Sequence, residues 1–172
     1  ILDNSLFYYR KVDIKSILEK SILSKYSTSA VPAHEWIDTC SKTSNINPKI
    51  ILVSLEKNLR LLSRTDYIAM ESLNGAMGVG VLPSGMVSPV YANFSMQIKA
   101  ACINYRRYFE LFDKGRKINC IDNNDVIPEN AFTYALYMAD PYVGTNDLYR
   151  IDTVKGEDGT VTPNKRLQYS AP

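Results

Sequence analysis

The segment NPKIILVSLEKNLRLL, residues 47–62, predicts a helix that is apolar on nearly every side. Asn47 is a suitable N-cap, and Pro48 fits the first helical position, where a backbone N–H has no partner within the helix. Further apolar residues flank the main stripe, as is typical of a helix surrounded by protein. We therefore expect this helix at the centre of a mainly α-helical fold. The stripe itself consists of Ile51, Leu52, Leu55, Leu59 and Leu62.

Four other segments carry apolar residues three or four positions apart, which predicts amphipathic helices on both sides of the central one. Asp13 and Asn93 precede two of them as caps, and Pro141 ends the last. The tail contains Asp158-Gly159, a dipeptide typical of the turn of a small β-hairpin. The predicted helices cover residues 14–26, 32–43, 94–112 and 129–140.

The length of 172 residues is enough for one substantial hydrophobic core. We expect a single domain over residues 1–155, followed by a hairpin or mobile tail over residues 156–172. Between the helices, residues 63–90 are irregular and include the glycine-rich GAMGVG at 75–80. This motif follows no predicted strand and lacks a Lys-Ser/Thr pair, so a phosphate loop is not expected. Long structured loops of this kind are often functional.

Several kinds of chemistry are excluded by composition. The one histidine, His34, rules out multi-histidine metal sites, and the three cysteines lack CxxC spacing. With 20 basic and 18 acidic residues the formal charge is +2, and no dense basic stripe indicates nucleic-acid binding. No apolar run reaches the length needed to span a bilayer. No metal or other cofactor is expected.

Carboxylates are therefore the first candidates for acid–base chemistry. Glycoside cleavage needs only carboxyl groups, because a protonated acid can donate to the leaving oxygen while a second group or the substrate completes the displacement. Glu56 lies on the central helix, and Asp66 and Glu71 follow it in the irregular segment. The alternative for each is a solvated or salt-bridged surface group.

Four blocks of sequence resemble the lysozyme-like superfamily, which includes goose-type lysozymes and soluble lytic transglycosylases, and most closely an exported bacterial branch of it. Their order and approximate spacing agree over residues 38–144. The resemblance implies a lysozyme-like helical domain with a glycine-rich cleft loop. The blocks are NINPKIILVSLEKNL at 45–59, GAMGVGV at 75–81, FSMQIKAACINYRRYF at 94–109 and ENAFTYALYMADPYVG at 129–144.

The resemblance also implies roles for individual residues. The first block corresponds to the helix bearing the catalytic Glu, and one alignment places Asn58 at that position while another places Glu56 there. Side chains 56 and 58 point about 200° apart around a helix, so only one can face a given cleft. We favour Asn58, because position 58 lies nearer the buried side of the apolar stripe. Glu71 is a further candidate for the acid.

Other blocks supply expected substrate contacts. Gly75, Ala76, Met77 and Gly78 correspond to a strand or turn lining the cleft, and Tyr91 and Tyr137 are candidates for stacking on or hydrogen bonding to sugar. Simple packing is an equal alternative for each tyrosine. The last block departs from the family pattern, since Met138 replaces the usual Asn and Asp140 the usual Gly.

The function that follows is binding, with or without cleavage, of a β-1,4-linked aminosugar polymer such as peptidoglycan. If active, the chain is a lysozyme-like hydrolase or lytic transglycosylase. The alternative is an inactive glycan-binding or structural module, because the amide of Asn58 cannot donate a proton as Glu does. A third hypothesis is a helical interaction domain whose similarity to the lysozyme-like superfamily is incidental. The implied location is the cell envelope or the extracellular space, or a phage particle.

Overall fold

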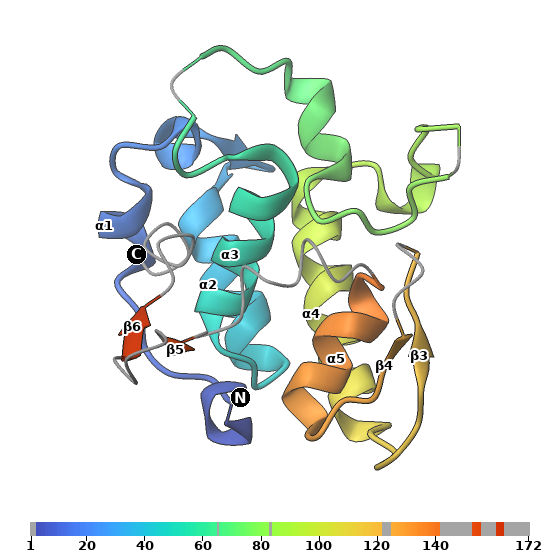
Figure 1. The fold of residues 1–172 in the computed structure, drawn as a ribbon. Helices are drawn as coiled ribbons and strands as arrows, with labels where there is room; N and C mark the ends of the chain where they lie inside the picture. Colours follow the sequence, from blue (N-terminus) through green and yellow to red (C-terminus); the bar gives the residue numbers. More distant parts are fainter. Residues whose placement is uncertain are drawn as a thin grey trace. The chain divides into compact units, whose positions relative to one another are not determined.

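The computed structural model describes residues 3–64, 66–82, 84–121 and 125–141, and the backbone of 153–155 and 161–163. It is mainly helical, with small two-stranded sheets (Figure 1). The residues group into two compact units, which we describe separately. One unit comprises residues 8–106, and the other comprises residues 1–7 together with 107–172. The expectation of one domain over 1–155 stays a prediction.

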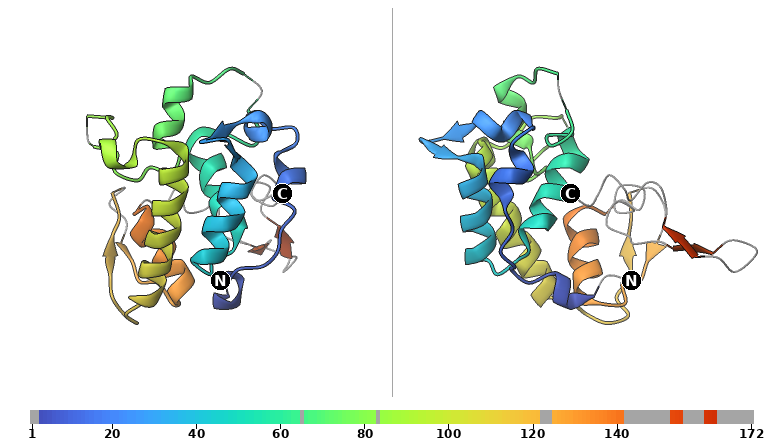
Figure 2. Two further views of the ribbon diagram at one scale, coloured as in Figure 1. Left: turned by 180° about the vertical axis from the view of Figure 1, so that it is seen from behind. Right: turned by 90° about the vertical axis from the view of Figure 1, so that its left-hand side faces the viewer.

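The unit of residues 8–106 contains most of the helices, and it holds all but one of the predicted site residues. A short antiparallel pair, β1 (Ser27–Thr28) and β2 (Val31–Pro32), precedes its second helix. The α-helices run up and down beside one another, and the irregular segment lies at the end where α3 finishes and α4 begins (Figures 1 and 2). The helices are α1 (Ile14–Leu18), η2 (Ile22–Lys25), α2 (Ala33–Thr43), α3 (Pro48–Leu59), η3 (Met70–Gly75), η4 (Pro89–Tyr91) and α4 (Phe94–Glu110).

Helix α3 is largely buried, as the sequence predicts. Ile51, Leu52 and Leu55 are completely inaccessible to solvent. Ser54 is also buried, and its hydroxyl donates to the carbonyl of Ile50 at 2.8 Å while sharing a hydrogen bond of 2.9 Å with the hydroxyl of Tyr105 on α4. A buried hydroxyl pair of this kind fixes the register of two helices because neither group can lose its partner without a desolvation penalty.

The predicted N-caps are confirmed. Oδ1 of Asp13 accepts from the backbone N–H of Ser16 at 3.1 Å, and Oδ1 of Asn47 accepts from that of Lys49 at 3.1 Å. Oδ1 of Asn93 accepts from the N–H of Met96 at 2.8 Å. Each cap satisfies a donor that the first helical turn leaves without a partner.

Two predicted helices end three or more residues earlier than expected. The first stops at Leu18, because the hydroxyl of Ser21 donates to the Leu18 carbonyl and accepts from the N–H of Leu23, starting the separate 3₁₀ turn η2. Helix α3 stops at Leu59 rather than at residue 62. Arg60 takes a left-handed conformation, with φ 55° and ψ 38°, a common way to end a helix.

The second unit contains α5 (Ala131–Ala139) and the C-terminal turn of α4. Here the ring of Phe7 stacks on that of Phe109, with centroids 4.0 Å apart, and meets the edge of Phe132 at 5.5 Å. The N–H of Phe132 donates to Oδ1 of Asn4 in the 3₁₀ turn η1 (Asn4–Leu6) at 3.0 Å. These contacts tie Asn4 and Phe7 to α5.

Between α4 and α5, a short antiparallel ladder joins β3 (Ile118–Asn119) and β4 (Asp125–Val126). Near the C-terminus, β5 (Thr153–Lys155) pairs with β6 (Val161–Pro163) in the antiparallel manner of the expected hairpin. Its predicted turn, Asp158-Gly159, lies outside the described residues. Within the described part of the chain, no helix is long and apolar enough to cross a membrane.

The packing of α4 provides a direct test of the core. Ile98 is completely buried and Ile103, on the same helix, is 51% exposed. We expect Ile98→Ala to lower the free energy of unfolding by about 2–5 kcal/mol and Ile103→Ala to change it by less than about 0.5 kcal/mol. Urea unfolding followed by circular dichroism measures both. Equal effects of the two substitutions would contradict the orientation of α4.

Candidate functional site

The side chain of Asn58 lies against the glycine-rich turn, although the two are far apart in the sequence. Its Nδ2 donates to the carbonyl oxygen of Ala76 at 3.1 Å. A Cβ atom built on Gly78 would lie 3.8 Å from the same Nδ2. The structure therefore brings together two of the elements that the sequence analysis assigns to one site: position 58 of α3 and the turn at 75–78.

The burial predicted for position 58 is wrong. Asn58 is exposed, whereas Glu56 is half-buried. Glu56 is the more buried of the two because its carboxyl group accepts hydrogen bonds from Leu62 and Ser63, in the segment that follows α3. The side chain of Asn58 is instead exposed to solvent next to the turn.

Glu56 has a structural role at the end of α3. Its Oε2 accepts hydrogen bonds from the backbone N–H groups of Leu62 and Ser63, at 3.0 and 3.1 Å. Its Oε1 accepts from the hydroxyl of Ser63. All three contacts use the carboxyl group as an acceptor, and they stabilise the segment that follows the left-handed Arg60. A group used in this way is poorly placed to donate a proton to a substrate.

Gln97, on α4, fixes the shape of the turn. Its side chain is completely buried, and its Oε1 accepts from the N–H groups of Met77 and Val79, both at 3.1 Å. Its Nε2 donates to the carbonyls of Val79 and Tyr91, at 2.8 and 2.9 Å. One amide thus makes four hydrogen bonds to the backbone on either side of Gly80. Gln97 is not among the residues predicted for the site, although a Gln on the apolar face of a predicted helix is a signal that could have identified it.

Glycines allow the turn to adopt its conformation. Gly78 and Gly80 have φ values of +71° and +69°, in the region that disfavours side chains. At Gly80 a Cβ would also overlap the ring of Tyr91. Tyr91, half-buried in the 3₁₀ turn η4, packs with its ring against Gly80. A contact of Tyr91 with sugar stays a prediction. The N–H of Ser88 donates to the carbonyl of Gly80 at 2.9 Å, which closes the small loop between them.

The other candidate carboxylates lie on the surface. Glu71 is exposed in the first turn of η3, the 3₁₀ helix that leads into Gly75. Asp66 accepts from Nε of Arg64 at 2.8 Å, and its side chain is 68% exposed. Asp66 thus has the surface ion pair that the sequence analysis gave as its alternative.

Tyr137 belongs to the other unit. It is 3% exposed and packs with Ile118, Cys120 and Tyr134 in the core of that unit. Packing, the alternative given for it, accounts for its position there. A role in sugar binding stays a prediction.

Cys40, Cys102 and Cys120 are all buried. Burial raises the pKa of the Cys102 thiol, and the neighbouring Cys40 raises it further. Burial also raises the pKa of Cys40. Both thiols are therefore protonated at neutral pH and are poor nucleophiles. Among the described residues, no group of three His, Cys, Asp or Glu side chains could hold a metal ion.

Comparisons of the chain with protein-family models, with curated proteins and with solved structures find no match. The resemblance to the lysozyme-like superfamily stays a prediction from the four sequence blocks. What the geometry adds is the contact between Asn58 and the turn.

The packing of Tyr91 on Gly80 can be tested with a matched glycine. Gly85 also has a positive φ, +82°, but a Cβ there would meet nothing within 4 Å. We expect Gly85→Ala to lower the free energy of unfolding by about 1–2 kcal/mol through backbone strain alone. Gly80→Ala should lower it by a further 1–3 kcal/mol or so, because the new methyl group displaces Tyr91. Urea unfolding distinguishes these outcomes, and equal losses would contradict the packing described here.

Proposed function

We propose that the surface formed by Asn58, the turn at residues 75–80 and Tyr91 binds a β-1,4-linked aminosugar polymer, with peptidoglycan as the substrate class, and that the chain holds this polymer without cleaving it. One observation carries the proposal: the amide of Asn58 contacts Ala76. The lysozyme-like resemblance implies that the residue at this position faces the turn that lines the glycan cleft. This contact agrees with that implied arrangement.

The chemistry of the surface suits aminosugars. Asn58 is exposed, and its contact with Ala76 uses one of its two N–H donors. A second N–H and the side-chain carbonyl therefore remain to pair with acetamido and hydroxyl groups of a sugar. Tyr91 adds an aromatic ring with a polar hydroxyl beside the turn, a combination that packs against one face of a sugar ring. Because Gln97 holds the turn in place, little ordering of the backbone is needed on binding.

The same geometry argues against cleavage by α3. An amide at position 58 has no proton to give to a leaving oxygen, and the carboxyl group of Glu56 accepts three hydrogen bonds from the chain that follows the helix. General acid catalysis needs a protonated carboxyl group within reach of the glycosidic oxygen. Asn58 has no carboxyl group, and that of Glu56 is engaged by the chain that follows the helix, so retention of the polymer is the function that this arrangement favours. The corresponding location is the cell envelope or the extracellular space.

Co-sedimentation with insoluble peptidoglycan tests the proposal. We expect the wild-type chain to be retained and Asn58→Ala to be retained about five- to tenfold more weakly, because one or two hydrogen bonds to the sugar are lost. Asn119→Ala, an exposed position on β3, is the matched control and should bind as the wild type does. In the same samples, release of soluble reducing ends or anhydro-sugars should stay at background.

Three outcomes would count against the proposal. Absence of retention by the wild type would leave no support for a glycan ligand. Equal retention of the Asn58→Ala and wild-type chains would place the binding surface elsewhere. Release of soluble sugar by the wild type, lost in Glu71→Gln, would show an enzyme whose acid is Glu71.

Asn58→Glu tests whether an acid at position 58 restores cleavage, since the resemblance implies a catalytic Glu at this position. A carboxyl group there must keep its proton to donate to the Ala76 carbonyl as Asn58 does, and the protonated form is the one a general acid needs. We expect this variant to release soluble sugar above the wild-type background. A folded variant that is still retained but releases nothing would show that an amide at position 58 is not what prevents cleavage.

A further inference from the structure

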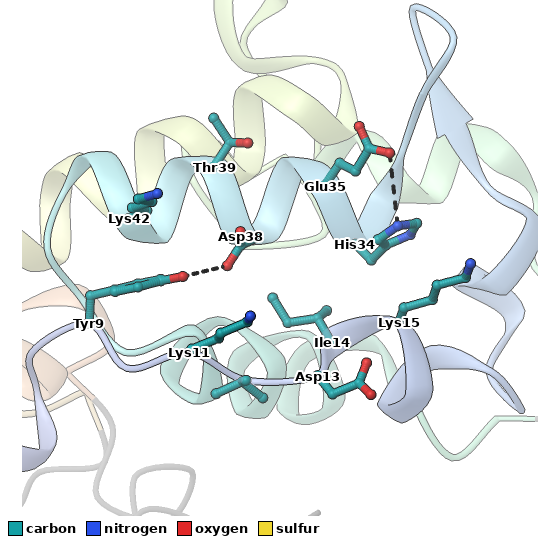
Figure 3. Close-up of a pocket in the computed structure, with 11 residues that line it drawn as sticks. Tyr9, Lys11, Asp13, Ile14, Lys15, His34, Glu35, Asp38, Thr39 and Lys42 are labelled. Atoms are coloured by element: carbon teal, nitrogen blue, oxygen red, sulfur yellow. Dashed lines mark hydrogen bonds and ion pairs between the residues drawn. The ribbon is translucent and has the colours of Figure 1, made fainter.

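A second region of the unit formed by residues 8–106 has the form of a ligand pocket. A cavity of about 570 Å³ lies between the segment 9–15 and the helix α2 (Figure 3). This volume lies within the usual range for small-molecule sites. The pocket shares no lining residue with the Asn58 surface, so its function is independent of the one proposed above.

The lining carries equal numbers of positive and negative side chains. Three lysines line the pocket, together with three carboxylates. The lysines are Lys11, Lys15 and Lys42, and the carboxylates are Asp13, Glu35 and Asp38. Figure 3 shows both signs on both walls, with Lys11 and Asp13 on the segment 9–15 and Asp38 and Lys42 on α2. An anion without a positive charge would meet three carboxylates here, and a cation would meet three ammonium groups. The neutral, mixed lining is complementary to a ligand with both signs.

The carboxylates and the lysines differ in their own contacts. Oδ1 of Asp38 accepts from the hydroxyl of Tyr9 at 2.9 Å, and Oδ1 of Asp13 caps α1. Oε1 of Glu35 lies 3.9 Å from Nε2 of His34. By contrast, Lys11, Lys15 and Lys42 have neither a hydrogen bond nor an ion pair to another side chain in the part of the chain that the structure describes. Their ammonium groups are available to a carboxylate of the ligand.

Spacing along α2 sets the length of the ligand. Glu35, Asp38 and Lys42 stand at positions i, i+3 and i+7, so they share one face of the helix. At 1.5 Å per residue, Glu35 and Lys42 are separated by about 10 Å along the axis. An extended chain of three residues spans about the same distance, at roughly 3.3–3.6 Å per residue. Val12 and the buried Ile14 supply apolar contacts for such a chain.

From this arrangement we infer that the pocket binds a short peptide, about three residues long, with a free amino group and a free carboxylate. The peptide lies along α2, with its ammonium group at Glu35 and its carboxylate at Lys42 and Lys11. The hydroxyl of Tyr9 fixes Asp38 at the middle of the site. The Asp38 hydrogen bond raises the pKa of the Tyr9 hydroxyl, with smaller effects of burial and of the Asp38 charge, so this hydroxyl stays a donor at neutral pH.

Titration of the whole chain with trialanine tests the inference. Binding is followed by isothermal calorimetry and by the backbone amide signals of residues 9–15 and 33–42 in two-dimensional NMR. We expect saturable binding with shifts confined to these segments. N-acetyl-trialanine lacks the ammonium group and trialanine amide lacks the carboxylate, so each should bind at least about tenfold more weakly. Alanine alone, which cannot span from Glu35 to Lys42, should bind weakly as well.

Substitutions assign the two ends of the ligand. Lys42→Met should weaken binding of trialanine about tenfold while leaving the affinity for trialanine amide unchanged. Glu35→Gln should likewise weaken binding of trialanine about tenfold while leaving the affinity for N-acetyl-trialanine unchanged. Lys49→Met and Glu19→Gln alter exposed residues outside the pocket and serve as matched controls. All four positions are exposed, so the variants should fold as the wild type does, which circular dichroism verifies.

Several results would overturn the inference. These are absence of saturable binding of trialanine, equal binding of the free and capped peptides, and shifts that lie outside the two segments. Citrate binding as tightly as trialanine would show a site for anions instead. Loss of peptide binding would leave retention on peptidoglycan unaffected, so the two proposals fail separately.

Discussion

The buried amide of Gln97 is the constraint on which the proposed glycan site depends. Four hydrogen bonds from this one side chain hold the backbone of Met77, Val79 and Tyr91. No aliphatic side chain could satisfy two donors and two acceptors at once, and leaving them without partners in a buried position would be strongly unfavourable. The amide therefore fixes the turn, the turn fixes the Ala76 carbonyl, and that carbonyl orients Asn58.

The second constraint is the way α3 ends. Arg60 in a left-handed conformation redirects the chain, and Glu56 accepts hydrogen bonds from the residues that follow. These hydrogen bonds distinguish Glu56 from Asn58, the two residues that alternative alignments place at the position of the catalytic Glu. One carboxylate stabilises the end of the helix, and the amide two residues later faces the turn. The proposal of binding without cleavage rests on this division of roles.

Local signals in the sequence predicted much of the fold. The caps Asp13, Asn47 and Asn93 mark helix starts because each interacts with residues two or three positions away. The apolar surround of α3 predicted its burial for a similar reason, since helix periodicity is a local property. Helix ends were predicted less well, because the early stops after Leu18 and Leu59 depend on the hydroxyl of Ser21 and on a left-handed Arg60.

The site was predictable only in part, because its contacts join distant segments. The pairing of position 58 with residues 75–78 came from resemblance, and helix geometry alone gave the wrong burial for Asn58. The role of Gln97 and the pocket between residues 9–15 and α2 were not predicted, since both depend on where separate segments meet in space. Charged side chains on one face of a helix are usually solvated. Those on α2 line a pocket because the segment 9–15 lies opposite them.

The most direct measurement of the central claim is an NMR titration of the isotope-labelled chain with a soluble β-1,4-linked tetramer of N-acetylglucosamine. The account predicts saturable shifts of the Asn58 side-chain amide and of the backbone amides of residues 76–80, with smaller changes elsewhere. Binding that leaves these signals unchanged, or the absence of any binding, would contradict it.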